Sequence, residues 1–425
     1  MSEDPGSEFR LSESLKGASR PLKVKLLVAL CCLMFFLFAL TTDAVGVIIP
    51  EVIRVYGLSH TEAGAFHYAT MAGIAVSGLG FGFVADRIGR KTTILLGLSL
   101  FALSAALFPL TGQFSVFAGL LFLSGLSIGL FKTAAQGVIG DLAHDDRHHT
   151  RLLNLVEGFF GLGAILGPLI VTHLLLNGAS WSGLYVLAAG LCLGLMTLAL
   201  GVRFPQRRPV PMRPGADDGV PIRWGTVLRD PWVLSISGLA MLYVGVETAV
   251  YVWMPTLLKG YEGALDWLAL YALPVFFVLR ALGRFIGVWM LASTDWTRVL
   301  AVSSGVVLVC FVAALVGGPD VAVFSLPVSG LFMSVIYPTL NSKGLSGFPQ
   351  RAHGTVGGVI LFFTALSAVL APLAMGAVAD QSGHIQAGFG LATVFAALLF
   401  AALLANAVRR PGMARLQRYG TRDAD

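Results

Sequence analysis

The stretch "GFVADRIGRK", residues 82–91, separates two long apolar runs and indicates how the rest of the chain is organised. It has the spacing G-x-x-x-D-R-x-G-R-K, formed by Gly82, Asp86, Arg87, Gly89, Arg90 and Lys91. A glycine at position 82 allows two helices to approach closely, and one at position 89 permits a tight turn. Asp86 can accept hydrogen bonds or face a helix N-terminus, and the basic cluster is typical of a cytoplasmic loop. The pattern therefore predicts a gating turn between two membrane helices.

The composition of the chain favours a bilayer over water. Of the 425 residues, 56% are hydrophobic and only 12% are charged, and the mean hydropathy is +0.80. A soluble domain of this size could not bury so much apolar surface. The first twenty or so residues are polar, and no small-residue cleavage site follows the first apolar run, so we expect that run to span the membrane.

Apolar stretches of roughly twenty residues recur along the whole chain, which is the length that a membrane helix needs. The predicted fold class is an all-α integral membrane protein with two six-helix halves, because a barrel would need short alternating strands instead. The twelve predicted helices are 24–49, 63–85, 92–110, 114–140, 152–176, 182–202, 231–257, 266–292, 297–317, 321–346, 354–378 and 385–408.

The distribution of Lys and Arg predicts the orientation of these helices. If the N-terminus is cytoplasmic, the opposite side keeps only Arg54 and Lys259, and Lys132 and Arg280 lie inside spans. The net charge of +6 is then a topology signal, and it gives no reason to expect nucleic-acid binding. Both termini are predicted to be cytoplasmic, in a multi-pass protein of the cell inner membrane. The predicted segments are a tail at 1–23, a half at 24–202, a linker at 203–230, a half at 231–408 and a tail at 409–425.

An internal repeat relates the two halves. "FALTTDAVGVIIP" aligns with "YVGVETAVYVWMP", "AILGPL" with "AVLAPL", and "FKTAAQ" with "IYPTLN", all at offsets of 204 or 205 residues. A duplicated six-helix unit is typical of transporters in which the substrate lies near the midplane, between the halves. The aligned pairs are Asp43 with Glu247, Pro50 with Pro255, Pro168 with Pro372, and Lys132 with Tyr337.

The turn at 82–91 and the twelve predicted spans resemble the major facilitator superfamily over nearly the whole chain, which implies alternating access by rocking of the two halves. A narrower resemblance, to the fucose:proton symporter family and its sugar-permease relatives, is carried by "LFALTTDAVGVIIP", "FKTAAQG", "LNLVEGFFGLGAILGP", "YVGVETA", "GRFIGVW" and "SVIYPTLNSKGL". That resemblance implies proton-driven uptake of a small sugar or polyol, with an acid on the first helix and a Glu on the fourth. Here the first-helix acid is Asp43, displaced by about one turn, and Lys132 stands at the fourth-helix position.

Five ionisable residues lie within the predicted spans, where charges normally face the bundle interior and pair with one another. We expect Asp43, Lys132, Glu247 and Arg280 to line the central cavity, either as a functional set or as structural ion pairs. Glu157, near the start of its span, is predicted to be an interfacial or packing residue. An acid should hold Lys132 until substrate arrives, because a nearby counter-charge offsets the cost of burying an ammonium group. Asp43 is the favoured partner and Glu247 the second.

Polar-tipped aromatic residues and amides near these charges could hold a sugar, although each aromatic could equally be a core residue. Asp43 is the predicted carrier of the coupling proton. The candidate substrate and coupling residues are Asp43, Lys132, Gln136, Glu247, Tyr243, Tyr251, Arg280, Tyr337 and Asn341.

These features predict a secondary active transporter that moves a small polar, sugar-like metabolite by alternating access, coupled to protons. One alternative is a transporter or exporter of a small organic anion, with Lys132 and Arg280 as counter-charges. A second is a receptor-like scaffold that binds solute without moving it. No P-loop or GxSxG motif suggests an enzyme. We expect no cofactor, no metal (the run "HDDRHH" at 144–149 being a solvated loop) and a monomer in the lipid bilayer.

Overall fold

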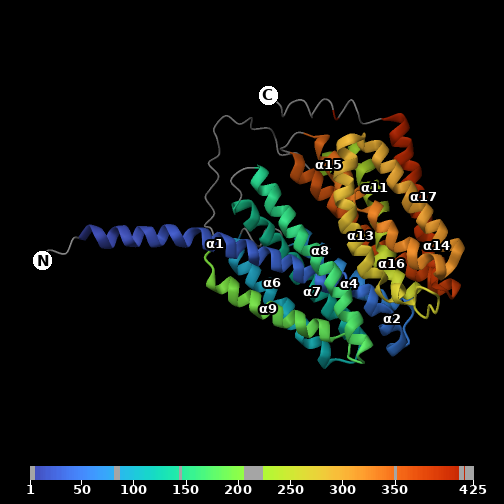
Figure 1. The fold of residues 1–425 in the computed structure, drawn as a ribbon, viewed down its shortest axis with the longest axis horizontal. Helices are drawn as coiled ribbons and strands as arrows, with labels where there is room; N and C mark the ends of the chain where they lie inside the picture. Colours follow the sequence, from blue (N-terminus) through green and yellow to red (C-terminus); the bar gives the residue numbers. More distant parts are fainter. Residues whose placement is uncertain are drawn as a thin grey trace.

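The computed structural model describes residues 5–80, 87–142, 146–204, 224–348, 352–410 and 416. Throughout those residues the regular structure is helical, and they contain no strand. The helices form two groups, which lie beside each other in Figure 1 with the blue-to-green N-terminal half on the left and the yellow-to-red C-terminal half on the right. The all-α membrane fold class predicted from the sequence is confirmed.

Each half is a run of long apolar helices joined by short connections. The N-terminal half contains α1 (Pro5–Thr42), α2 (Val45–Tyr56), α3 (His60–Ala63), α4 (Ala65–Gly80), α6 (Arg90–Leu107), η1 (Phe108–Leu110), α7 (Phe114–Leu142), α8 (Asp146–Leu176) and α9 (Gly183–Gly201). The C-terminal half, preceded by the short α10 (Trp224–Val227), contains α11 (Pro231–Thr248), η2 (Ala249–Trp253), α12 (Met254–Leu257), α13 (Asp266–Ser293), α14 (Trp296–Met333), α15 (Ile336–Ser346), α16 (His353–Ser382) and α17 (Ile385–Arg409).

Ten helical stretches among the described residues are long and apolar enough to cross a membrane, against the twelve expected. Two local features account for the difference. The second expected span is represented by α4, whose description ends at Gly80 and leaves it 16 residues long. The ninth and tenth expected spans form one continuous stretch, Trp296–Ser346. Gly318 interrupts that stretch with a non-helical backbone (φ 65°, ψ −159°), close to the boundary expected between the two spans.

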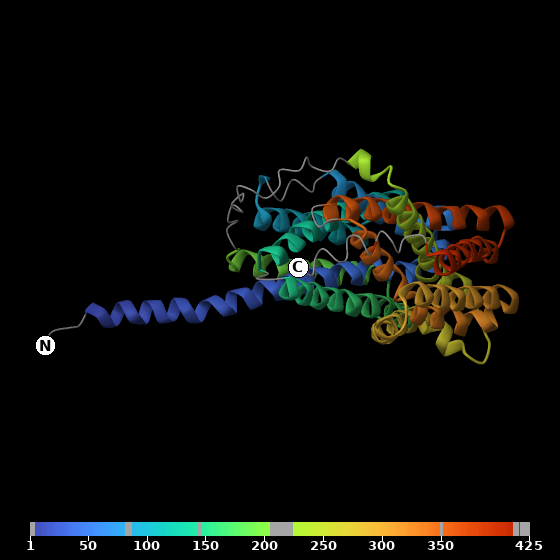
Figure 2. The ribbon, with the colours of Figure 1, turned by 90° about the horizontal axis from the view of Figure 1, so that it is seen from above.

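The chain before the first span is helical rather than irregular. The first helix begins at Pro5 and continues without interruption into the bundle, so residues 5–23 project from it as part of α1. Figures 1 and 2 show this projection as the long blue helix that leads away from both halves. Most of the predicted linker, residues 205–223, lies outside the described residues.

Close helix packing within the N-terminal half depends on small residues in α8. A Cβ atom at Gly163 or Gly167 would overlap the backbone carbonyl oxygens of Phe36 and Leu40 in α1. The two glycines are four residues apart, so they lie on one face of α8 and allow its backbone to approach α1 closely. Packing of this kind replaces the hydrophobic effect inside a bilayer, where lipid is as apolar as the helix surface.

The first helix of each half is broken at the same place in the repeat. In the N-terminal half, the residues Asp43 and Ala44 form a turn between α1 and α2. In the C-terminal half, α11 passes into the π-type turn η2 before α12. Pro50 and Pro255 follow these breaks, and each removes a backbone N–H that a regular helix would use. Both acids of the repeat, Asp43 and Glu247, therefore lie beside irregular backbone in the middle of the bundle.

Candidate substrate-binding site

Asp43 lies at the break between α1 and α2 and is buried. Its Oδ2 accepts a hydrogen bond of 3.1 Å from the hydroxyl of Thr42. Its charged neighbours come from both halves: Arg280 and Glu247 from the C-terminal half, and Lys132 from the N-terminal half. A buried carboxyl with one neutral hydrogen bond and several charges nearby has the surroundings of a proton-exchanging group in a transporter.

Glu247 ends α11, and its carboxylate is fully engaged by neighbours from its own half. The Arg280 Nη2 lies 2.6 Å from Glu247 Oε1, and the Tyr243 hydroxyl donates to the same oxygen at 2.8 Å. The ring of Tyr337 stacks on that of Tyr243, with centroids 6.3 Å apart and planes 20° from parallel. The C-terminal side of the site is thus one hydrogen-bonded cluster of a carboxylate, a guanidinium and a phenol under an aromatic lid.

The two broken helices also meet each other across the halves. A Cβ atom at Gly46 in α2 would overlap the backbone carbonyl of Tyr251 in η2, so only glycine allows this approach. In a regular helix the Tyr251 carbonyl would accept from residue 255, which is a proline and has no N–H. The Tyr251 ring then packs edge-on to His67 of α4, with centroids 5.3 Å apart. Tyr251 therefore contacts the opposite half through both its backbone and its side chain.

Lys132 contacts aromatic rings rather than a carboxylate. Its Nζ lies 4.7 Å from the ring centroid of Phe38 and 5.7 Å from that of Phe35, both in α1. Among the described residues it has no ion pair within 4.0 Å, so the direct contact expected between Lys132 and Asp43 is not formed. Cation–π contacts explain how the charge is accommodated, because an ammonium above a phenyl ring is attracted to its negative face. Asp43 and Glu157 act on it only at longer range.

The remaining predicted residues lie further along the same helices. Gln136, one turn after Lys132 in α7, has an exposed side chain, and Asn341 in α15 is half-buried. Tyr337 follows the turn that separates α14 from α15. Asp43, Glu247, Tyr243, Arg280 and Tyr337 thus form or adjoin one charged cluster, whereas no contact of Gln136 or Asn341 with that cluster is observed.

Arg284 is a candidate residue that the sequence analysis assigned to a span end. It lies one turn after Arg280 in α13, and its electrostatic neighbours include Glu157, Tyr243 and Glu247. Glu157, expected to be interfacial or structural, is exposed and acts electrostatically on both Lys132 and Arg284. The i, i+4 spacing of the two arginines was the sequence signal for a second inward-facing cation, because residues four apart share a helix face.

The gating stretch is only partly described, since Gly82 and Asp86 lie outside the described residues. Gly89 has φ of +87°, the left-handed region that favours glycine, immediately before α6 begins. Arg90 forms an ion pair with Asp141 of α7. Lys91 donates to the backbone oxygens of Leu200 and Val202 at 2.8 and 3.1 Å. These basic residues therefore tie helices of the N-terminal half together, and the gating role of the stretch, including Arg87, remains a prediction.

A bundle of apolar helices with charged groups gathered at the centre, between two related halves, defines a polytopic membrane transporter. The chain belongs to the Major Facilitator Superfamily, whose sequence profile matches residues 31–372. It is a multi-pass transporter of small substrates in the inner membrane, and its family and fold are those of transporters rather than enzymes.

Characterised relatives cover nearly the full length of the chain. It is 24% identical to the L-fucose-proton symporter of Escherichia coli (strain K12) over 88% of this chain and 91% of the relative. It is 25% identical to the glucose/galactose transporter of Brucella abortus, over 83% and 87%. The gallate transporter of Pseudomonas putida is 24% identical, over 92% of each chain. The crystal structure of the nucleoside transporter NupG superimposes with a TM-score of 0.74 at 13% identity, covering 89% of this chain and 99% of that one.

Proposed function

We propose that the protein moves a small, sugar-like polar metabolite together with a proton, by alternating access of a site between its two halves. The observation that carries the proposal is the position of Asp43. It is buried at a helix break, hydrogen-bonded to a neutral hydroxyl, and within electrostatic range of charges from both halves. A proton that binds there changes the charge balance of exactly the groups that lie between the halves.

The relatives support the substrate class and the coupling ion. Two of them are an L-fucose-proton symporter and a glucose/galactose transporter. The site adds hydroxyl and amide groups of the kind that bind sugars: the phenols of Tyr337 and Tyr251 and the amides of Gln136 and Asn341.

The proposed arrangement in the membrane follows the distribution of Lys and Arg. Both termini face the cytoplasm, residues 24–202 and 231–408 form the moving halves, and 203–230 links them. The protein functions as a monomer, because the proposed substrate site lies wholly between the two halves of one chain.

Replacement of Asp43 by Asn tests the coupling. In proteoliposomes, L-fucose, D-glucose and D-galactose would each be added outside while the internal pH is recorded with a trapped dye. The parent should acidify the lumen as the accepted sugar enters. Asp43→Asn should lose proton-driven accumulation by at least about ten-fold yet keep exchange of labelled for unlabelled sugar, because the amide holds the site but carries no proton.

Ser99→Ala serves as the control, because Ser99 is an exposed residue of α6 outside the proposed site. Acidification by Asp43→Asn at the rate of the parent would contradict the coupling role. Binding of sugar without any exchange in the parent would indicate a receptor-like scaffold instead.

A second candidate substrate is a small organic anion, favoured by the state of Lys132. Its ammonium lies over two phenyl rings without a carboxylate within 4.0 Å, so it is available as a counter-charge. The likeness to a gallate transporter supports the same class. Affinities for D-glucose and for gallate would be measured on the parent and on Lys132→Ala over about two pH units on either side of neutrality. Loss of gallate binding in the variant selects the anion. Retained sugar binding with a displaced pH optimum selects the sugar.

A further inference from the structure

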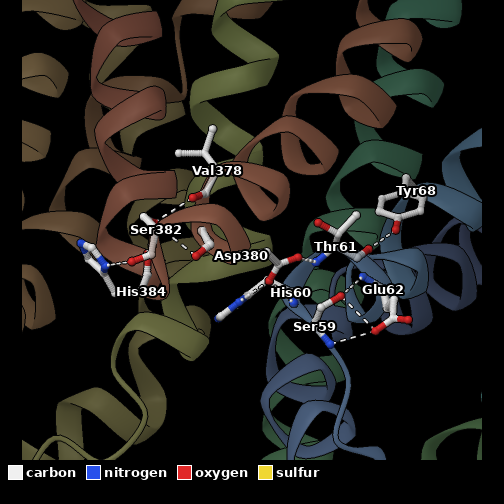
Figure 3. Close-up of polar contacts among 10 residues, drawn as sticks. Ser59, His60, Thr61, Glu62, Tyr68, Val378, Asp380, Ser382 and His384 are labelled. Atoms are coloured by element: carbon white, nitrogen blue, oxygen red, sulfur yellow. Dashed lines mark hydrogen bonds and ion pairs between the residues drawn. The ribbon is translucent and has the colours of Figure 1, made fainter.

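A carboxylate of one half binds the backbone of the other half at one end of the bundle. Asp380, near the end of α16, reaches α3 in the connection between α2 and α4 (Figure 3). Its Oδ1 accepts from the backbone N–H of His60 at 2.7 Å, and its Oδ2 accepts from the N–H of Thr61 at 2.9 Å. The His60 Nδ1 lies 2.9 Å from Oδ1. Three contacts to one carboxylate thus join the two halves.

The local structure of α3 leaves these two amides free for Asp380. Ser59 and Glu62 form a capping box: the Ser59 hydroxyl accepts from the Glu62 N–H at 3.2 Å, and the Glu62 carboxylate accepts from the Ser59 N–H at 2.9 Å. The N–H groups of His60 and Thr61 belong to the first turn of the helix, where no intrahelical acceptor exists. Asp380 supplies the missing acceptor from the opposite half.

The carboxylate is also positioned from its own side. Ser382 ends α16 and donates to the backbone oxygen of Val378 at 2.7 Å, and His384 contacts the Ser382 carbonyl at 2.7 Å (Figure 3). These contacts stay within the C-terminal half. Ser382 therefore has the surroundings of a matched control residue, close to Asp380 but without a bond across the halves.

Other contacts across the halves gather at the same end, which we call the α3 end. The Lys259 Nζ, just after α12, donates to the backbone oxygen of Pro50 in α2 at 2.7 Å. The ring of Trp253 lies 6.1 Å from that of His60. At the opposite end the polar contacts of Arg90 remain within its own half. The structure is thus fastened between the halves at the α3 end.

We propose that the Asp380 carboxylate is a clasp that closes the α3 end and sets the balance between the two access states. The inference rests on the proposed alternating access, because Asp380 and α3 must separate whenever the halves open at that end. The side chains of His60 and Asp380 are 24% and 25% exposed. Water can therefore replace the contacts as they break, which makes the clasp reversible. Asp380 is a positioning residue that acts through the halves and has no contact with the charged cluster at the centre.

Thiol labelling in lipid nanodiscs, where a soluble maleimide reaches both ends, tests this proposal. The background has Cys31, Cys32, Cys192 and Cys310 replaced by alanine. One reporter is Leu258→Cys, a buried position that lines a cavity of about 380 Å³ between α2 and α12. The second reporter is Gln136→Cys, which is exposed in this structure.

Asp380→Ala should label about ten-fold faster or more at Leu258→Cys than the parent, because it loses all of the charge-assisted contacts. It should also label more slowly at Gln136→Cys, since the halves then spend less time in the present state. Asp380→Asn should be intermediate, because its amide oxygen can still accept from one N–H. Asp380→Glu should restore most of the closure, and Ser382→Ala should remain within about two-fold of the parent.

Two patterns would overturn the proposal: equal labelling of parent and Asp380→Ala, or faster labelling at Leu258→Cys without slower labelling at Gln136→Cys. The second pattern would indicate local fraying of α3 rather than a change of access state. If Asp380→Ala fails to fold, Asp380→Asn carries the same comparison. Exchange of L-fucose or D-glucose by the parent is measured separately, so failure of transport and failure of the clasp give different results.

Discussion

The two halves hold their central charges in opposite ways. In the C-terminal half, Glu247 is bound by Arg280 at 2.6 Å and by Tyr243 at 2.8 Å, so its charge is neutralised locally. In the N-terminal half, Asp43 has only the Thr42 hydroxyl at 3.1 Å, and Lys132 faces phenyl rings. Although Asp43 and Glu247 are equivalent in the repeat, only one has a direct ionic partner. The C-terminal cluster thus has the character of a fixed wall, and the N-terminal charges are the ones left to respond to a proton or a solute.

The largest expected effect comes from breaking the closed pair. Arg280→Ala leaves the Glu247 carboxylate buried without its counter-charge, and loss of one partner of a buried ion pair costs about 3–5 kcal/mol. The free energy of unfolding in detergent would be measured for Arg280→Ala, Glu247→Gln and the double variant. Because the neutral glutamine needs no counter-charge, the double variant should be more stable than the sum of the single losses predicts. Strictly additive losses would contradict a direct pair.

The next largest effect should come from the phenol that completes the cluster. Tyr243→Phe removes the hydrogen bond to Glu247, and hydrogen bonds to charged groups contribute about 1.5–3 kcal/mol. Tyr185→Phe is the matched control, because the buried Tyr185 hydroxyl has no hydrogen-bond partner among the described residues. The control should leave stability unchanged or slightly raised. Equal losses in the two variants would show that the Tyr243 hydroxyl contributes nothing specific.

The smallest effect on stability is expected in the N-terminal half. Lys132→Met keeps an unbranched apolar stem against Phe38 and loses only the cation–π attraction, worth about 0.5–2 kcal/mol. Its melting temperature should therefore fall less than that of Arg280→Ala under the same conditions. A loss as large as that of Arg280→Ala would mean that Lys132 neutralises a buried carboxylate after all, and the contrast between the halves would fail.

Much of the architecture was predictable because it depends on local composition. The apolar runs, the 204-residue repeat and the acids and bases within spans are visible in the linear chain. The gating stretch and the resemblance to a transporter family required no coordinates either. The boundary between the ninth and tenth spans is less distinct in the structure, because helix continues to both sides of Gly318 and the bend there is a single residue.

The sequence by itself determined that this protein is a duplicated bundle of membrane helices with charges at its centre, since hydropathy over about twenty residues decides insertion. Only the tertiary structure decided which charges touch. It placed Lys132 over Phe38 instead of beside Asp43, and it joined Asp380 to α3 across 319 and 320 positions of sequence. The reason is physical: contacts of 3–4 Å depend on the rotation and crossing of helices from different halves, and close packing of distant residues such as Gly46 and Tyr251 sets that geometry.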